Sequence, residues 1–147
     1  MKKYKLNEAR IRLCEGAALY DEVPISSPKA AVDIVAMELE ILDREEIIII
    51  NLDSQLHPLN YNVVSVGDVN RSMLCIRNIM KSAILSNASG LIMLHNHPSG
   101  NVTPSDDDIQ STKHVNDACK LMDMTLLDHI IVGSNGRYYS FKENGGI

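Results

Sequence analysis

Two histidines, a serine and an aspartate stand at spacings suited to metal binding between residues 95 and 108. His95 and His97 are two residues apart, Ser105 comes eight residues after His97, and Asp108 comes three after Ser105. A zinc ion used in catalysis is typically held by three histidine or carboxylate ligands, while a fourth position stays open for water. His95, His97 and Asp108 are such a set, so this segment predicts a zinc site.

The residues around the histidine pair predict how its side chains are arranged. Residues 91–94 are an apolar run, which is typical of a buried strand. Alternate residues on a strand point to the same face, so His95 and His97 are expected to face one way and Asn96 the other. Pro98 cannot donate a hydrogen bond to a neighbouring strand and is expected to end this one.

A helix is expected to begin at Ser105, which puts Asp108 in its first turn near the positive end of the helix dipole. The same pair also resembles a capping box, with Asp in the place of the usual Glu or Gln. Ser105 and Asp108 therefore have a structural interpretation beside the chemical one. Asp106 and Asp107 lie in the same turn and are alternatives to Asp108 as the carboxylate ligand.

The order His-x-His, seven residues, Ser, two residues, Asp resembles the signature of the JAMM (MPN) metallopeptidases. The longer string around it resembles the RadC-like branch of that superfamily, in residues 62–67, 94–100 and 127–133. The similarity extends from about Arg12 to Lys142. HNH nucleases also have a set of His, Asn and His residues, but they differ because those three residues are dispersed along a hairpin and a helix. Where RadC-like chains often have His-Pro, this chain has Cys75 and Ile76.

The resemblance implies an α/β chain with the three-layer cytidine-deaminase-like (JAMM) fold, in which helices flank a mixed β-sheet. It also implies a bound Zn2+ ion, and its seven-residue spacing favours Asp108 as the third ligand. Residues 1–147 are expected to form a single RadC-like JAMM domain. The N-terminal helix-hairpin-helix region of larger RadC proteins is not expected in it.

The resemblance further implies an upstream glutamate that moves protons near the metal without binding it. The candidates are Glu45 and Glu46, just before the apolar strand at 47–50. Counting back from the Leu-Asp pair at 52–53 in the RadC-like pattern favours Glu45. The alternative is that both glutamates simply solvate the entrance of the strand. Ser105 is expected to donate a hydrogen bond to the oxyanion formed during hydrolysis.

Three further polar residues have more than one interpretation or carry no site. His129, next to Asp128, either orients a ligand histidine or is structural, because the register of its strand cannot be derived from the sequence. Cys75 is a nucleophile in principle, but no base is evident beside it, so a buried helix thiol is expected. His114 lies off the apolar stripe of its helix and is expected to be exposed.

The composition limits the partners and the compartment. The chain has 147 residues, of which 45% are hydrophobic, so it can bury a sizeable core. Its net charge of −5 argues against tight nucleic-acid binding, which usually needs a basic face. Three cysteines without a Cys-x-x-Cys pair argue against a disulfide framework and suit the reducing cytoplasm. No signal peptide or apolar stretch of membrane-spanning length is evident, so a cytoplasmic location without membrane contact is expected.

Hydrophobic patterns predict helices interleaved with strands. An edge strand is expected up to about residue 16, and Ser27 followed by Pro28 predicts the start of a helix. Strands are expected at 46–52, 61–66, 91–97, 125–132 and 138–141, and helices at 74–86 and 105–122. The buried stripe is expected to include Ile84 in the first of these helices, and Ile109 and Met122 in the second.

These features predict a zinc-dependent hydrolase that cuts an amide bond in a peptide or isopeptide, with a peptide or protein as its partner. One alternative keeps the metal but changes the substrate, for example to a phosphoester or another amide. An alternative of a different class is a non-catalytic binding module that keeps the fold and is associated with DNA repair by family name only. The complete ligand set together with Ser105 favours the enzyme.

Overall fold

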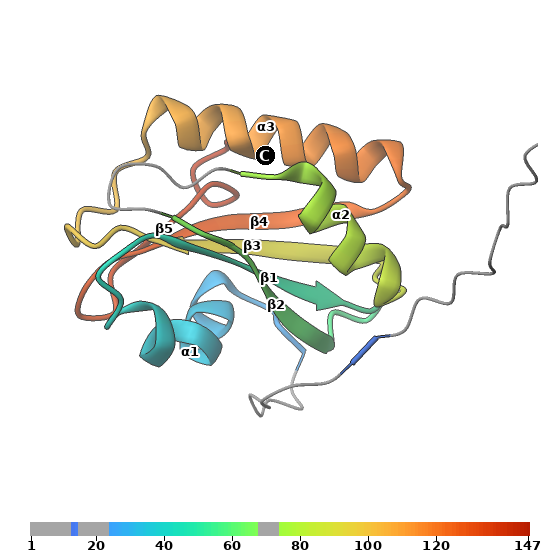
Figure 1. Ribbon diagram of the computed structural model, residues 1–147, viewed down its shortest axis with the longest axis horizontal. Coiled ribbons are helices and arrows are strands. Elements are labelled where there is room, and N and C mark those ends of the chain that lie inside the picture. The colour runs from blue at the N-terminus through green and yellow to red at the C-terminus, as the bar shows by residue number, and fades with distance from the viewer. Residues whose placement is uncertain (1–12, 15–23, 68–73) are drawn as a thin grey trace, which may run out of the picture.

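The computed structural model describes residues 13–14, 24–67 and 74–147, which form three helices and five strands (Figure 1). The strands are β1 (Glu46–Leu52), β2 (Pro58–Val66), β3 (Gly90–Asn96), β4 (Thr125–Val132) and β5 (Tyr138–Ser140). The helices are α1 (Pro28–Leu39), α2 (Ile76–Leu85) and α3 (Asp106–Leu121). Helices and strands are interleaved along the chain, as predicted for the α/β class.

The strands form one mixed sheet in the order β2-β1-β3-β4-β5. Strands β3 and β4 are parallel and are connected through α3, whereas the other neighbouring pairs are antiparallel. Helix α1 covers one face of the sheet, and α2 and α3 cover the other (Figure 1). The sheet is thus the middle of three layers, which confirms the predicted architecture.

The central strands β1 and β3 are buried on both faces, because helices cover both sides of the sheet. Ile48 packs with residues of α1 in one core, while Ile47 packs with residues of α2 and α3 in the other. An uninterrupted apolar run is typical of strands in this position. In β3 the same alternation puts Leu94 on the α1 side and Met93 on the α3 side, which assigns the next residue, His95, to the α3 side.

The start of α1 agrees with its prediction. The Oγ atom of Ser27 accepts a hydrogen bond from the backbone N–H of Ala30, and Pro28 is the first helical residue. Proline is favoured there because the N–H that it lacks would have no partner within the helix. The three cysteines are free, as expected. The prediction that Cys75 is a buried helix thiol is wrong, since it is exposed at the position just before α2.

Three residues predicted to be buried are instead largely exposed: Ile84 by 46%, Ile109 by 53% and Met122 by 42%. Each helix packs on the sheet through a stripe narrower than its apolar pattern, and Met122 lies beyond the last residue of α3. Strand β2 begins at Pro58, earlier than predicted. The edge strand predicted before residue 16 lies mostly outside the described residues. None of the helices in the described segments is long and apolar enough to cross a membrane.

Candidate metal centre

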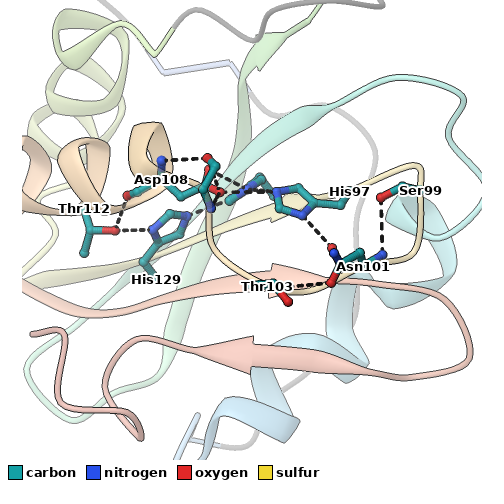
Figure 2. A network of polar contacts seen from close by, with 9 residues as sticks. His97, Ser99, Asn101, Thr103, Asp108, Thr112 and His129 are labelled. Carbon is teal, nitrogen blue, oxygen red and sulfur yellow. Dashed lines mark hydrogen bonds and ion pairs between the residues drawn. The ribbon is translucent and has the colours of Figure 1, made fainter.

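His95, His97 and Asp108 come together where β3 ends and α3 begins (Figure 2). His95 is the second-last residue of β3, and His97 follows the strand directly. The chain then forms a loop that returns to Asp108 in the first turn of α3. The side chain of His95 is almost fully buried, whereas those of His97 and Asp108 are partly open to solvent. One side of the group is therefore accessible.

The donor atoms of the three side chains face one another at short distances. The Nε2 atom of His95 lies 3.0 Å from Nε2 of His97 and 3.1 Å from Oδ1 of Asp108. The Oδ2 atom of Asp108 lies 3.4 Å from Nε2 of His97. Donors at about 2.0–2.2 Å from a tetrahedral zinc ion are about 3.3–3.6 Å apart. These separations are close to those of a three-ligand zinc site, so the residues fit the metal that the sequence predicts.

The other ring nitrogen of His97 is fixed by the loop. Its Nδ1 atom donates to the backbone carbonyl of Asn101 over 2.6 Å. Because a carbonyl oxygen only accepts, the proton lies on Nδ1, and a neutral His97 keeps its Nε2 lone pair directed toward the group. Asn101 is held in turn, since its N–H donates to Ser99 and its Oδ1 accepts from the N–H of Thr103 (Figure 2).

The loop depends on a glycine. Gly100 has a φ of +75°, and a Cβ atom there would lie 2.5 Å from the Oγ atom of Ser134. A residue with a side chain would therefore be both strained and crowded. The side chain of Arg137 donates to the carbonyl oxygen of Gly100, which ties the loop to the segment that follows β4.

The carboxylate of Asp108 belongs to the helix cap and to the candidate metal group at once. Its Oδ2 atom accepts hydrogen bonds from the N–H and the Oγ of Ser105, both at 2.7 Å, and Ser105 Oγ accepts from the N–H of Asp108. Burial by itself would raise the pKa of Asp108, but its contacts with the imidazoles of His95 and His97 outweigh it, so that the pKa is lowered well below its usual value. Asp108 is therefore an anion facing two imidazoles.

His129 of β4, labelled in Figure 2, contacts the Nδ1 atom of His95, the ring nitrogen that does not face the group. The Nε2 atom of His129 lies 2.8 Å from Nδ1 of His95, and its Nδ1 atom lies 2.6 Å from the hydroxyl of Thr112. The Thr112 hydroxyl donates over 2.7 Å to the backbone carbonyl of Asp108. The His129 ring stacks on Phe141 and is only 1% exposed, and burial lowers its pKa well below the usual value. The side chain is thus a neutral imidazole.

The regular alternation of side chains along β4 would not have predicted the face of the sheet on which His129 lies. The parallel ladder of β3 and β4 shifts register at Leu127, since Leu91 pairs with Leu126 and Ile92 pairs with Asp128. This irregularity directs His129 toward α3 and His95. Nothing in the local sequence of Thr112 indicated a histidine partner 17 positions away.

Glu45 and Glu46 lie opposite the histidine pair across the β1–β3 ladder. Ile47 and His95 are the last pair of the β1–β3 ladder, and extending their antiparallel register by two residues would put Glu45 beside His97. By alternation Glu45 shares the α3 face with Ile47, whereas Glu46 belongs to the α1 face. The hydrogen bond with Asp108 is the main cause that raises the pKa of His97, and the negative charge of Glu45 raises it further. Glu45 is therefore close to the group, although its role stays a prediction.

The middle residue of the His-Asn-His string clamps the main chain on both sides of Glu45. The Oδ1 atom of Asn96 accepts from the N–H of Glu46 over 2.8 Å, and its Nδ2 donates to the carbonyl of Arg44 over 2.9 Å. Asn96 is 2% exposed and faces away from His95, as predicted. The sequence indicated this orientation of Asn96 but not its partners.

The remaining candidates lie outside the group. Asp106 and Asp107 are exposed in the first turn of α3 and are not part of the cluster with His95. Asp128 is buried and accepts hydrogen bonds from Ser140 Oγ and from the N–H of Lys142, while burial raises its pKa. His114 is exposed on α3, as predicted.

Comparisons with known proteins agree with this geometry. A family model described as RadC-like JAB domain matches residues 25–146. A protein named UPF0758 from Desulfitobacterium hafniense is 40% identical over 121 residues, which are 82% of this chain and 53% of the relative. UPF0758 proteins of Roseiflexus castenholzii and Thermotoga maritima are 40% and 41% identical over 82% and 74% of this chain. The chain spans about half the length of these curated relatives.

Proposed function

The chain belongs to the family of RadC-like JAB domains, within the JAB/MPN superfamily, and from this premise we propose that it is a zinc-dependent hydrolase of amide bonds. The observation that carries the proposal is the convergence of two imidazoles and one carboxylate within 4.8 Å on a partly open side of the domain. Membership of the superfamily makes a metal-dependent hydrolase plausible, and the substrate class is our inference. Because the relatives are about twice as long, a peptide or isopeptide substrate is proposed for this domain alone.

The proposed ligands are His95, His97 and Asp108. A zinc ion held by them would lower the pKa of a bound water to about 7 and polarise the scissile carbonyl. Other residues of the chain already orient these donor atoms in the structure. Asn101 keeps Nε2 of His97 directed at the group, and the charges on Asp108 and Glu45 make the site attractive to a cation.

Glu45 is proposed to take the proton of the attacking water and return it to the leaving amine. The support is its place beside His97, on the same side of the sheet as His95, together with its electrostatic effect on His97. The clamp by Asn96 holds the backbone of this segment, which limits how far the carboxylate can move. A positioned acid or base of this kind typically contributes about 10²–10⁴-fold to the rate.

Ser105 is proposed to donate a hydrogen bond to the oxyanion that develops on the substrate carbonyl. In the structure its hydroxyl proton points instead to Oδ2 of Asp108. The proposed role therefore requires the hydroxyl to rotate from the ligand carboxylate toward the substrate. A contact of this type is typically worth about 3 kcal/mol in the transition state.

The test pairs two neighbouring glutamates in the zinc-loaded protein. Glu45→Gln should keep the zinc content and the unfolding transition of the wild type, because it is nearly isosteric and not a ligand. Hydrolysis of peptide and isopeptide substrates should nevertheless fall by roughly 10²-fold or more. Glu46→Gln, on the other face of the sheet, is the matched control and should stay close to the wild type.

Each other outcome has a definite meaning. Loss of activity in Glu46→Gln alone would move the proton-transfer role by one residue. Full activity in both variants would remove these glutamates from the mechanism. A wild type that cuts only phosphoesters would favour the first alternative. A zinc-loaded wild type that cuts no amide or phosphoester would favour a binding module.

A further inference from the structure

His129 is a completely buried titratable side chain that the proposed mechanism does not use. It lies between a candidate ligand and a helix, with Nε2 at 2.8 Å from Nδ1 of His95 and Nδ1 at 2.6 Å from Oγ1 of Thr112. The Thr112 hydroxyl continues to the backbone oxygen of Asp108 over 2.7 Å. Three hydrogen bonds thus connect two candidate ligands that stand on different elements (Figure 2).

The direction of these hydrogen bonds follows from counting protons, beginning at Asp108. Its backbone oxygen can only accept, so the single hydroxyl proton of Thr112 is directed to it. Thr112 must then accept at its second contact, which places a proton on Nδ1 of His129. A neutral imidazole carries one ring proton, so Nε2 of His129 accepts from Nδ1 of His95. His95 therefore has its proton on Nδ1 and its lone pair on Nε2.

We propose that His129 and Thr112 are positioning residues that hold His95 in the Nδ1–H tautomer, with the Nε2 lone pair directed at the metal. The inference rests on the proposed zinc site and adds the device that prepares one of its ligands. Groups that bind the second nitrogen of a ligand histidine fix its tautomer and the orientation of its ring. In this chain the group is another histidine, and a threonine fixes the tautomer of that histidine.

The opposite direction conflicts with the geometry. It would leave Oγ1 of Thr112 and the carbonyl oxygen of Asp108 at 2.7 Å with no proton between them. It would also put a proton on Nε2 of His95, the atom that is proposed to bind the metal.

The arrangement also links ligands on separate elements. Thr112 and Asp108 are four residues apart on α3, so the hydroxyl of Thr112 reaches the backbone of the same turn that presents the Asp108 carboxylate. His95 is on β3, and His129 on β4 connects the two elements. These hydrogen bonds therefore couple the position of His95 to the first turn of α3, which carries Asp108.

The first test reads the tautomers directly in the metal-free wild type. Long-range ¹H–¹⁵N correlation spectra of imidazole-labelled protein at about pH 8, where ordinary imidazoles are neutral, distinguish protons on Nδ1 from protons on Nε2. We expect the Nδ1–H form for both His95 and His129. The Nε2–H form on either residue, or averaging between the two forms, would overturn the proposal without bearing on whether zinc binds.

The second test changes the end of the chain of hydrogen bonds. Thr112→Val keeps the shape but removes the hydroxyl, so His129 should populate its Nε2–H form and the zinc affinity should fall by roughly 10-fold or more. Thr112→Ser restores a hydroxyl and should recover both the tautomer and the affinity. Ser111→Ala, on the same helix turn, should change neither. Competition with a chromophoric chelator measures the affinity.

A Thr112→Val variant with unchanged tautomers and unchanged zinc affinity would contradict the proposal. If the variant does not fold, the tautomers of the wild type still decide. If the wild type binds no zinc at all, the proposed function fails, whereas the tautomers in the metal-free protein continue to test this inference separately.

Discussion

Asp108 shows that one carboxylate can satisfy two interpretations that the sequence presented as alternatives. Its Oδ2 atom closes the capping box with Ser105, while its Oδ1 atom faces Nε2 of His95. The cap fixes the side chain in the first turn of α3, where the positive end of the helix dipole favours an anion. Helix capping is thus the means by which this candidate ligand is oriented.

At this scale we expect the purified wild type to contain about one zinc ion per chain. His95→Ala and His97→Ala should each lose most of it, because two remaining donors do not hold the metal tightly. Asp108→Asn should weaken the affinity, since an amide oxygen is a poorer ligand than a carboxylate. Elemental analysis of protein purified without chelator measures the content, and His114→Ala, an exposed histidine of α3, is the control. Unchanged zinc in all three variants would disprove the site.

The ends of the elements, and not their middles, build the site. Strand β3 carries His95 near its end, α3 carries Asp108 in its first turn, and Glu45, the proposed general base, lies in the segment before β1. Side chains at such positions need ties that hold the adjoining loops, and Asn96 and Gly100 provide them. The apolar runs in the middle of the strands stabilise the sheet that keeps these ends together.

The clamp by Asn96 predicts a stability effect. Asn96→Ala should lower the free energy of unfolding by about 2 kcal/mol, since two partly buried hydrogen bonds are lost at about 1 kcal/mol each. Asn62→Ala, at an exposed asparagine of β2, should change it by less than about 0.5 kcal/mol. Urea unfolding followed by circular dichroism measures both. Equal stabilities of the two variants would show that the clamp contributes nothing.

Asp128 predicts a pH dependence with a defined sign. Burial raises the pKa of Asp128 in the folded state above its ordinary value of 3.8, so its contribution to stability is fully present below that value and is lost as the pH rises through the raised pKa. Asp128→Asn imitates the protonated form. The stability of the variant relative to the wild type, as measured by urea unfolding, should therefore increase as the pH rises from about 4 through the raised pKa. A relative stability that decreases over this range would reverse the assignment.

At the scale of the whole molecule, the candidate site lies on the α3 side of the sheet. The net charge of the chain bears on whether it binds nucleic acid. The net charge of the chain is −5. The curated relatives that it matches are about twice as long as this chain. Electrostatic attraction to phosphates supplies most non-specific binding to DNA. The acidic balance of the domain argues against it.

We therefore expect this chain to bind duplex DNA more weakly than about 10⁻⁶ M at physiological salt. Fluorescence anisotropy with a labelled duplex, over a range of salt concentrations, measures it. Nanomolar binding that weakens steeply with salt would contradict the prediction and would point to a substrate or partner on DNA.

The sequence by itself predicted the candidate ligand set and determined the class of fold. His95, His97 and Asp108 were predicted from residue types and spacings, because a strand end and a helix start are local features. The helix starts at Ser27 and Ser105 were predicted for the same reason, since a cap depends on a few adjacent residues. The prediction of which residues of α2 and α3 are buried was less accurate, because apolar periodicity does not show how wide a stripe of each helix the sheet covers.

Only the tertiary structure decided which distant residues support the ligands. The pairing of Ile47 with His95 put Glu45, not Glu46, on the side of the histidines, and the register shift at Leu127 turned His129 toward His95. Both depend on the register between strands far apart in the sequence. A shift of one residue exchanges the two faces of a strand, and no local pattern in this chain records that register.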